Sequence, residues 1–93
     1  MIALAIEEMT NNIITYGFSD GKSHSIDIRI IKNSDSILLR IRDNCRNFDP
    51  VKYLELHQED DPFSHIGIRM VMKLVKDARY ETSLGLNNLV LTL

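Results

Sequence analysis

Two neighbouring runs of alternating residues constrain the fold of this chain most. Residues 24–31 are HSIDIRII and residues 36–43 are SILLRIRD, so Ile or Leu recurs at every second position of each run. Successive side chains of a strand point to opposite faces, and each run therefore predicts a β-strand with one apolar face. The intervening KNSD predicts a turn, which makes the pair an antiparallel hairpin. We expect a helix to cover the face carrying Ile26, Ile28 and Ile30 on one strand and Ile37, Leu39 and Ile41 on the other.

Two helical patterns can supply this cover. The first is an apolar stripe that ends at Gly17 and contains Ile2, Ile6, Met9 and Ile13. It starts at the first residue with no capping signal, from which we expect a chain that lacks a first helix and strand. The second pattern lies within residues 66–78 and contains Ile66, Met70 and Leu74, with Val71 and Val75 beside them. Met9, Met70 and Met72 fit a role in filling the core.

The rest of the chain predicts a second hairpin and a long loop. RYETS at 79–83, a turn around Gly85 and NNLVLTL at 87–93 are typical of two more strands. Residues 44–65 are polar and contain two prolines and the acidic run 59–61, although VKYLEL at 51–56 can form a short helical turn. We therefore predict a single α+β domain over residues 1–93. It is a two-layer α/β sandwich with an antiparallel-rich sheet covered on one face by helices.

Composition excludes several classes of function. The net charge is −2 with acids and bases interspersed, which argues against a nucleic-acid or anionic-lipid partner. The single Cys45 excludes an internal disulfide, and together with His24, His57 and His65 it is too scattered in sequence to predict a zinc site. A single cysteine fits a reducing compartment, so a cytoplasmic location is the default expectation. No apolar run reaches the roughly 18 residues of a spanning helix.

Three groups of polar residues are candidates for a binding site. Glu8 and Asn12 are four residues apart and flank the apolar stripe, where a carboxylate and a carboxamide can hold a hard cation or a water; the alternative is a solvated flank. Asp43 ends a strand and can accept a hydrogen bond from an exocyclic amine, or simply form an Asp-Asn turn. Gly67 begins the second helix, whose free N–H groups can meet a phosphate.

In their order and spacing these residues resemble the GHKL ATPases, specifically the branch of histidine kinase-like ATPases that contains the bacterial anti-sigma factor serine kinases. The resemblance covers essentially the whole chain and implies a Bergerat-type ATP-binding fold. It implies that Glu8 is the general base and Asn12 the magnesium ligand. It also implies that Asp43 binds the adenine amine and that Gly67 is the last glycine of the phosphate-proximal box. Residues 51–64 match the lid over the nucleotide.

The chain departs from the family where glycines are usual, at Cys45, Asn47, Ser64 and His65. Asn47 tolerates a glycine-like backbone and stays a candidate for nucleotide binding, whereas Cys45 is strained there unless the local turn differs. His65 can donate to a phosphate, or be an ordinary loop histidine, and Arg69 can add positive charge. Tyr16 replaces a histidine of the family, which we interpret as a packing change.

The resemblance implies a domain that binds ATP or ADP with Mg²⁺ and regulates a protein partner, such as a sigma factor or an anti-anti-sigma-like protein, with possible serine phosphorylation. The alternative is a catalytically inactive nucleotide-binding module of a larger protein, either soluble or membrane-bound with this domain in its cytoplasmic part. A third alternative, an interaction domain with an empty pocket, does not explain why Glu8, Asn12, Asp43 and Gly67 are all present. A homodimer is compatible with any of these.

Overall fold

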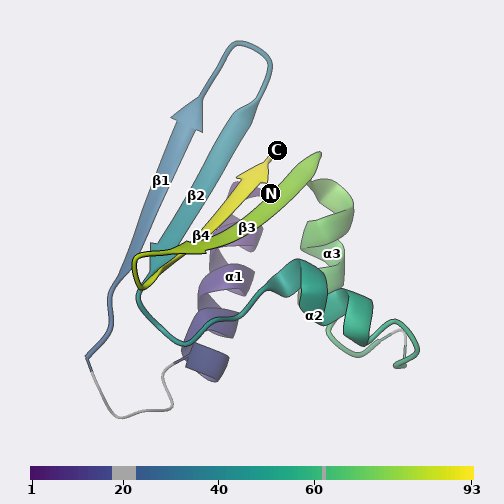
Figure 1. Cartoon of the computed structure of the whole chain (residues 1–93). Coiled ribbons are helices and arrows are strands. Elements are labelled where there is room, and N and C mark those ends of the chain that lie inside the picture. Colours follow the sequence, from purple (N-terminus) through teal and green to yellow (C-terminus); the bar gives the residue numbers. More distant parts are fainter. Residues whose placement is uncertain (18–22, 62) are drawn as a thin grey trace.

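The computed structural model describes residues 1–17, 23–61 and 63–93. Residues 18–22, which follow the first predicted helix, and the proline at 62 lie outside the described residues. The elements follow in the order α1 (Ile2–Gly17), β1 (Ile26–Lys32), β2 (Ile37–Asp43), α2 (Pro50–Leu56), α3 (Ile66–Leu74), β3 (Asp77–Ser83) and β4 (Leu86–Thr92) (Figure 1). Both predicted hairpins and both predicted helices are confirmed.

The strands form one antiparallel sheet in the order β1-β2-β4-β3. Strand β4 pairs with its hairpin partner β3 on one side and with β2 of the first hairpin on the other, so that it joins the two hairpins into one sheet (Figure 1). This register places Asp43 at the end of β2 opposite Asn87 near the start of β4. The pairing matters for the site, because it brings a carboxylate and a carboxamide together from distant parts of the chain.

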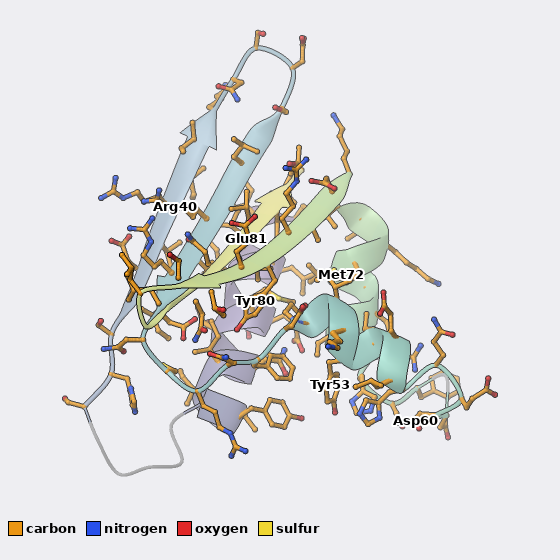
Figure 2. All side chains as sticks on the ribbon, in the orientation of Figure 1. Arg40, Tyr53, Asp60, Met72, Tyr80 and Glu81 are labelled. Atoms are coloured by element: carbon orange, nitrogen blue, oxygen red, sulfur yellow. The ribbon has the colours of Figure 1, made fainter. Side chains whose placement is uncertain are left out.

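Helices α1 and α3 cover one face of the sheet, which confirms the predicted two-layer α+β fold. The core is formed by side chains from both helices and from the two central strands: Ala5, Met9, Ile13, Leu39, Ile41, Ile68, Val71, Leu89 and Leu91. On the opposite face the strands carry polar residues, among them Arg40 and Glu81 (Figure 2). Alternation of apolar and polar residues along the strands accounts for this division.

The helices cover less of the sheet than the sequence predicts. Leu39 and Ile41 on β2 are fully buried, but their neighbours on the same face of β1, Ile30 and Ile28, are 52% and 39% exposed. The prediction that a helix covers both strands is therefore wrong for Ile28 and Ile30, whereas Ile26 of β1 packs against the core. The reason is topological, since β1 is an edge strand and the helices pack over the central strands β2 and β4.

Helix α3 buries only part of its predicted apolar pattern. Val71 is buried and Val75 packs against the core, together with Ile68, whereas Ile66, Met70 and Leu74 are exposed. The two faces are both apolar, so the spacing of the residues could indicate a helix without deciding which side meets the core. Of the methionines, Met9 is buried and Met72 packs against the core, while the expectation for Met70 is wrong.

Helix α2 begins at a local capping sequence, Asp49 followed by Pro50. Asp49 is its N-cap, and its Oδ1 accepts hydrogen bonds from the backbone N–H groups of Val51 at 3.0 Å and Lys52 at 3.2 Å. Pro50 occupies the first helical turn, where its missing N–H has no cost. The first half of the predicted lid is therefore a regular helix.

Candidate functional site

Glu8 and Asn12 lie on the same side of α1 and contact each other. The Asn12 Nδ2 donates to the backbone carbonyl of Glu8 at 2.7 Å and to its carboxylate Oε1 at 3.3 Å. Both residues are partly buried. Because the amide nitrogen is bonded to Glu8, the Asn12 Oδ1 is the atom of this side chain suited to a cation, with an oxygen donor of Glu8 beside it.

Gly67 lies directly against the carboxyl group of Glu8. A Cβ added to Gly67 would overlap the Glu8 Cδ and both carboxylate oxygens, so an alanine there would require the Glu8 side chain to move. The contact occurs where α1 and α3 pack together. Two of the three candidate groups, separated by almost 60 residues in the sequence, are therefore adjacent in the structure.

Asp43 belongs to a separate, buried network. It is 5% exposed, and its Oδ1 accepts hydrogen bonds from the Cys45 backbone N–H at 2.9 Å and the Asn87 Nδ2 at 2.8 Å. The Asn87 Nδ2 also donates to the backbone carbonyl of Cys45 at 2.9 Å. These bonds fix the orientation of the carboxylate at the end of β2, as a residue that recognises a ligand requires.

The turn after Asp43 avoids the strain that a missing glycine could cause. Among the described residues, the non-glycine positions with positive φ are His65 and Leu84, so Cys45 and Asn47 have ordinary backbone angles. Cys45 is buried against the end of α1, where a Cβ on Gly17 would come within 2.7 Å of the Cys45 Cβ. Gly17 thus permits α1 to approach the Asp43 turn closely. Asn47 is exposed in the same loop.

His65 does occupy a conformation that favours glycine. It is the N-cap of α3 with φ of 56° and ψ of 33°, in the left-handed region, which costs a non-glycine residue roughly 1–2 kcal/mol. Its ring is held on both sides: Nδ1 lies 3.3 Å from the Tyr53 hydroxyl and Nε2 lies 3.2 Å from Asp60 Oδ2. The side-chain contacts offset the strain of the backbone.

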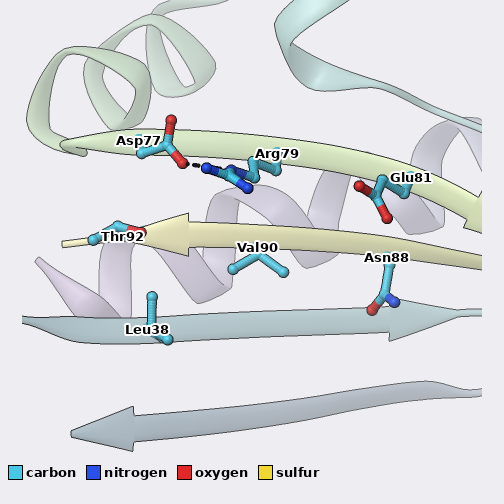
Figure 3. Close-up of a pocket in the computed structure, with 7 residues that line it drawn as sticks. All are labelled: Leu38, Asp77, Arg79, Glu81, Asn88, Val90 and Thr92. Carbon is cyan, nitrogen blue, oxygen red and sulfur yellow. Dashed lines mark hydrogen bonds and ion pairs between the residues drawn. The ribbon is translucent and has the colours of Figure 1, made fainter. Parts of the chain in front are cut away.

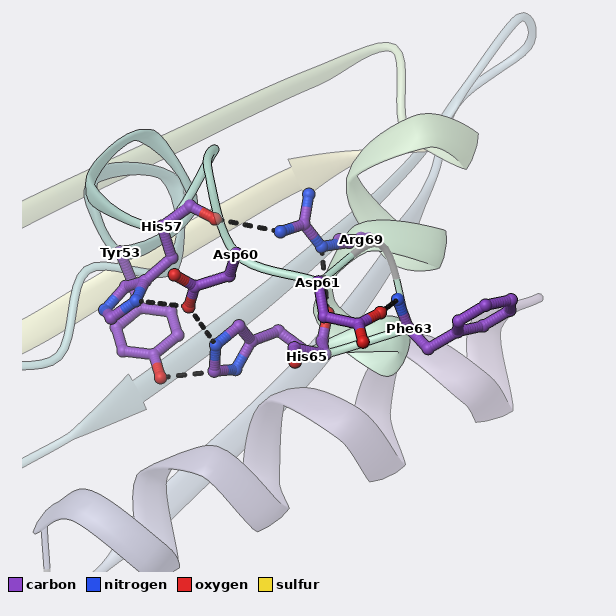
Figure 4. A network of polar contacts seen from close by, with 8 residues as sticks. Tyr53, His57, Asp60, Asp61, Phe63, His65 and Arg69 are labelled. Atoms are coloured by element: carbon purple, nitrogen blue, oxygen red, sulfur yellow. Dashed lines mark hydrogen bonds and ion pairs between the residues drawn. The ribbon is translucent and has the colours of Figure 1, made fainter.

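Arg69 is directed toward the lid loop. Its Nε donates to the Ser64 carbonyl and its Nη2 to the His57 carbonyl, each at 2.9 Å (Figure 4). One guanidinium group therefore joins the two ends of the loop between α2 and α3. These two bonds use the Nε and one N–H of Nη2, so the Nη1 group is the part of Arg69 suited to the phosphate contact that the sequence predicts.

Aromatic rings connect the end of α1 to the lid. Tyr16 stacks on Phe48 with a centroid distance of 4.7 Å, and Tyr53 contacts both rings, in agreement with the predicted packing role of Tyr16. A hydrogen bond with Tyr16, followed by burial, raises the pKa of Tyr53 to about 12. Burial also raises the pKa of Tyr80, whose hydroxyl accepts the Phe48 backbone N–H at 3.0 Å.

Two surface hollows lie away from Glu8, Asn12 and Asp43, although Arg69 lines one of them. One, of about 380 Å³, is on the outer face of the sheet, where Asp77 and Arg79 form an ion pair at 3.0 Å beside Val90 (Figure 3). The other, of about 660 Å³, is lined by α2, α3 and the beginning of β3. Neither is lined by Glu8, Asn12 or Asp43, so the candidate site rests on side-chain geometry rather than on concavity.

Sequence reasoning missed two parts of the site. Asn87 points to the same face of β4 as the buried Leu89 and Leu91. The signal in the sequence was a polar residue at a position that the strand alternation assigns to the core. The second part is a cluster of His57, Asp60 and His65, whose ligand atoms lie within 4.8 Å of one another. The expectation that the histidines are scattered is thus wrong for two of the three, because the loop folds back between α2 and α3.

Comparison with known proteins is consistent with this geometry. The family described as histidine kinase-like ATPase domain matches residues 1–93, the whole chain. A serine/threonine-protein kinase, BtrW, of Bordetella bronchiseptica is 28% identical over 96 aligned positions, which cover 98% of this chain and 67% of the relative. No solved structure matches. Within the described part of the chain, no helix has the length and apolar character needed to cross a membrane.

Proposed function

Because this chain belongs to the histidine kinase-like ATPase domains, we propose that it binds an adenine nucleotide with Mg²⁺ between α1, the end of β2 and the lid, and that this binding regulates a protein partner. The observation that carries the proposal is the contact of Glu8 with both Asn12 and Gly67. That contact unites the proposed base, the proposed metal ligand and the N-terminus of a helix at one place. The fixed carboxylate of Asp43 supports a separate subsite for the base of the nucleotide.

In this proposal Asp43 accepts the exocyclic amine of adenine. Its Oδ1 is already bonded to Cys45 and Asn87, which makes Oδ2 the acceptor for the ligand. A buried carboxylate held by two donors is oriented before the ligand arrives, so little conformational entropy is lost on binding. An asparagine at this position has one acceptor oxygen and one donor NH2 group. In one of the two orientations of its amide, the NH2 group would face the adenine amine, which is also a donor.

The residues of α1 and α3 fit the phosphate end of a nucleotide. The Asn12 Oδ1 and the carboxylate of Glu8 are hard oxygen donors of the kind Mg²⁺ prefers, and Asn12 is the proposed ligand. When bound, Mg²⁺ would neutralise charge on the phosphates. The backbone N–H groups at the start of α3 face the same region, because the glycine at 67 lies against Glu8.

Phosphoryl transfer is the finer part of the proposal. The Glu8 carboxylate would accept the proton of a partner's serine hydroxyl while that oxygen forms a bond to the γ-phosphorus and ADP leaves. The similarity to BtrW, described as a serine/threonine-protein kinase, supports this reaction class. The partner of this chain would then be a protein that presents a serine to α1.

A second candidate function is nucleotide binding without turnover, with closure of the lid altering a partner surface. The specific observation in its favour is the lid itself. His65 is engaged by Tyr53 and Asp60, and Arg69 by two backbone carbonyls, so both cationic candidates for phosphate contact have internal partners.

Calorimetric titration with ATP and ADP, with and without Mg²⁺, tests the binding proposal. We expect Asp43→Asn to weaken both nucleotides at least about tenfold, and Asn12→Ala to abolish the dependence on Mg²⁺. Asp27→Asn on the exposed edge strand and Asn11→Ala, next to Asn12 and exposed, are matched controls. Nucleotide affinity that is unchanged in Asp43→Asn would remove Asp43 from the site.

Turnover is tested separately. Glu8→Gln should retain nucleotide binding and lose phosphoryl transfer to a serine, whereas Glu7→Gln, the exposed neighbour, should behave like the parent protein. Binding by the parent protein with no transfer to any candidate partner would favour the second function. Full turnover by Glu8→Gln would exclude Glu8 as the base.

A further inference from the structure

The loop between α2 and α3 gathers three metal-ligating side chains that the nucleotide site does not use together. His57 follows the last residue of α2, His65 is the N-cap of α3, and Asp60 lies between them. Both rings are turned toward the same carboxylate oxygen (Figure 4). The His57 Nδ1 lies 2.9 Å and the His65 Nε2 lies 3.2 Å from Asp60 Oδ2.

These distances are close to those of a tetrahedral metal site. Zinc binds imidazole nitrogen and carboxylate oxygen at about 2.0–2.2 Å, which places the ligand atoms of one tetrahedron roughly 3.3 Å apart. Two of the three pairs already have this separation, and all three atoms lie within 4.8 Å of one another. Closing the remaining pair requires a movement of the His57 ring, whose side chain is partly exposed.

The surroundings hold the ligands in orientation. The Tyr53 hydroxyl lies 3.3 Å from the Nδ1 of His65, and the other ring nitrogen, Nε2, faces the cluster. Histidine ligands of metals commonly have such a hydrogen-bond partner on the nitrogen that does not bind the metal. The two bonds of Arg69 to the His57 and Ser64 carbonyls fix both ends of the loop. The Arg69 guanidinium therefore bonds to backbone carbonyls of the loop.

The choice of metal follows from the donors. Two imidazoles and one carboxylate favour Zn²⁺ and similar transition metals over Mg²⁺ and Ca²⁺, which prefer oxygen donors alone. The competing interpretation is an ion pair in which protonated histidines bond to Asp60 with no metal. That arrangement needs the same contacts, so direct metal binding is the observation that separates the two.

We propose that His57, Asp60 and His65 bind one Zn²⁺, with a fourth position open to water or to a ligand atom from a partner. The metal would connect the end of α2 to the beginning of α3 and fix the lid loop in the conformation seen here. This site is distinct from Asn12 and Glu8, and its existence does not depend on nucleotide binding.

The test is titration of the metal-free protein with Zn²⁺ by calorimetry, in the absence of nucleotide, with Mg²⁺ as the comparison ion. Zn²⁺ should bind with a stoichiometry of one, and the melting temperature should rise. His57→Gln and Asp60→Asn should each weaken Zn²⁺ at least about tenfold, since loss of even an outer partner costs that much. His24→Gln, which removes the histidine outside the cluster, is the matched control.

A chain that shows no saturable Zn²⁺ binding overturns the proposal, as does equal affinity in the parent protein and in both cluster variants. An equal loss in His24→Gln would place the metal elsewhere and also overturn it. Circular dichroism of the variants without metal separates a lost ligand from a lost fold. Because no nucleotide is present, a negative result here leaves the proposed ATP site untouched.

Discussion

The two sides of the candidate site are constructed differently. Asp43 is buried at the end of a central strand and bonded to Asn87, and Glu8 and Asn12 lie on the longest helix of the described chain. The lid side consists of a short helix and a loop held by side-chain contacts among half-exposed residues, mainly those of Arg69 and Asp60. The first side is therefore the more rigid of the two, whereas the second is free to rearrange at modest energetic cost.

The largest expected effect comes from Asn87 on the fixed side. Asn87→Ala removes the donor to the Asp43 carboxylate and to the Cys45 carbonyl, both in a buried environment. Leaving such groups without their partner should reduce the free energy of unfolding by about 3 kcal/mol, measured by urea denaturation. Asn88→Ala, the next residue, should cost less than about 1 kcal/mol. Equal losses in the two variants would contradict the role of this network.

A smaller loss is expected from Arg69 on the lid side. Arg69→Gln removes two charge-assisted hydrogen bonds to backbone carbonyls that are only partly buried, for an expected loss of about 1–2 kcal/mol. Amide hydrogen exchange should show faster exchange confined to residues 57–65. Lys73→Gln, on the exposed part of the same helix, is the control. Uniformly faster exchange across the sheet would show that the two sides are not independent.

Gly67→Ala should change stability by less than about 1 kcal/mol, because the gain in helix propensity opposes the displacement of a flexible carboxylate. The added methyl group overlaps the Glu8 carboxyl, so the informative quantity is the coupling to Glu8. In a double-mutant cycle, Gly67→Ala should be more favourable in a Glu8→Ala background. An identical effect in both backgrounds would show that the two residues do not contact each other in solution.

The smallest effect at neutral pH concerns Tyr53. Its folded-state pKa of about 12 exceeds the usual 10, chiefly because of the Tyr16 hydrogen bond, so the neutral phenol is favoured in the folded chain. Above pH 10 the unfolded chain loses this proton first, and stability should decline as the pH rises toward 12. Tyr53→Phe should flatten that decline in urea midpoints measured at increasing pH. A decline as steep as in the parent protein would assign it to other groups, including Tyr80.

The sequence by itself determined most of the elements and the places of four candidate residues on them. Alternation in residues 24–43, the helical stripe ending at Gly17 and the turn at Gly85 are local patterns, and each corresponds to an element of the structure. The positions of Glu8, Asn12, Asp43 and Gly67 were predictable because their spacing is tied to those elements. Their functional roles remain predictions.

Only the tertiary structure decided which surfaces meet. It placed β4 between β2 and β3 and so paired Asn87 with Asp43, buried Ile68 rather than Met70, and left Ile30 exposed on an edge strand. It also brought His57 and His65 onto one carboxylate across a loop. Local patterns specify the faces of an element, but the choice among apolar faces and the closure of loops depend on packing between distant segments, which no local pattern encodes.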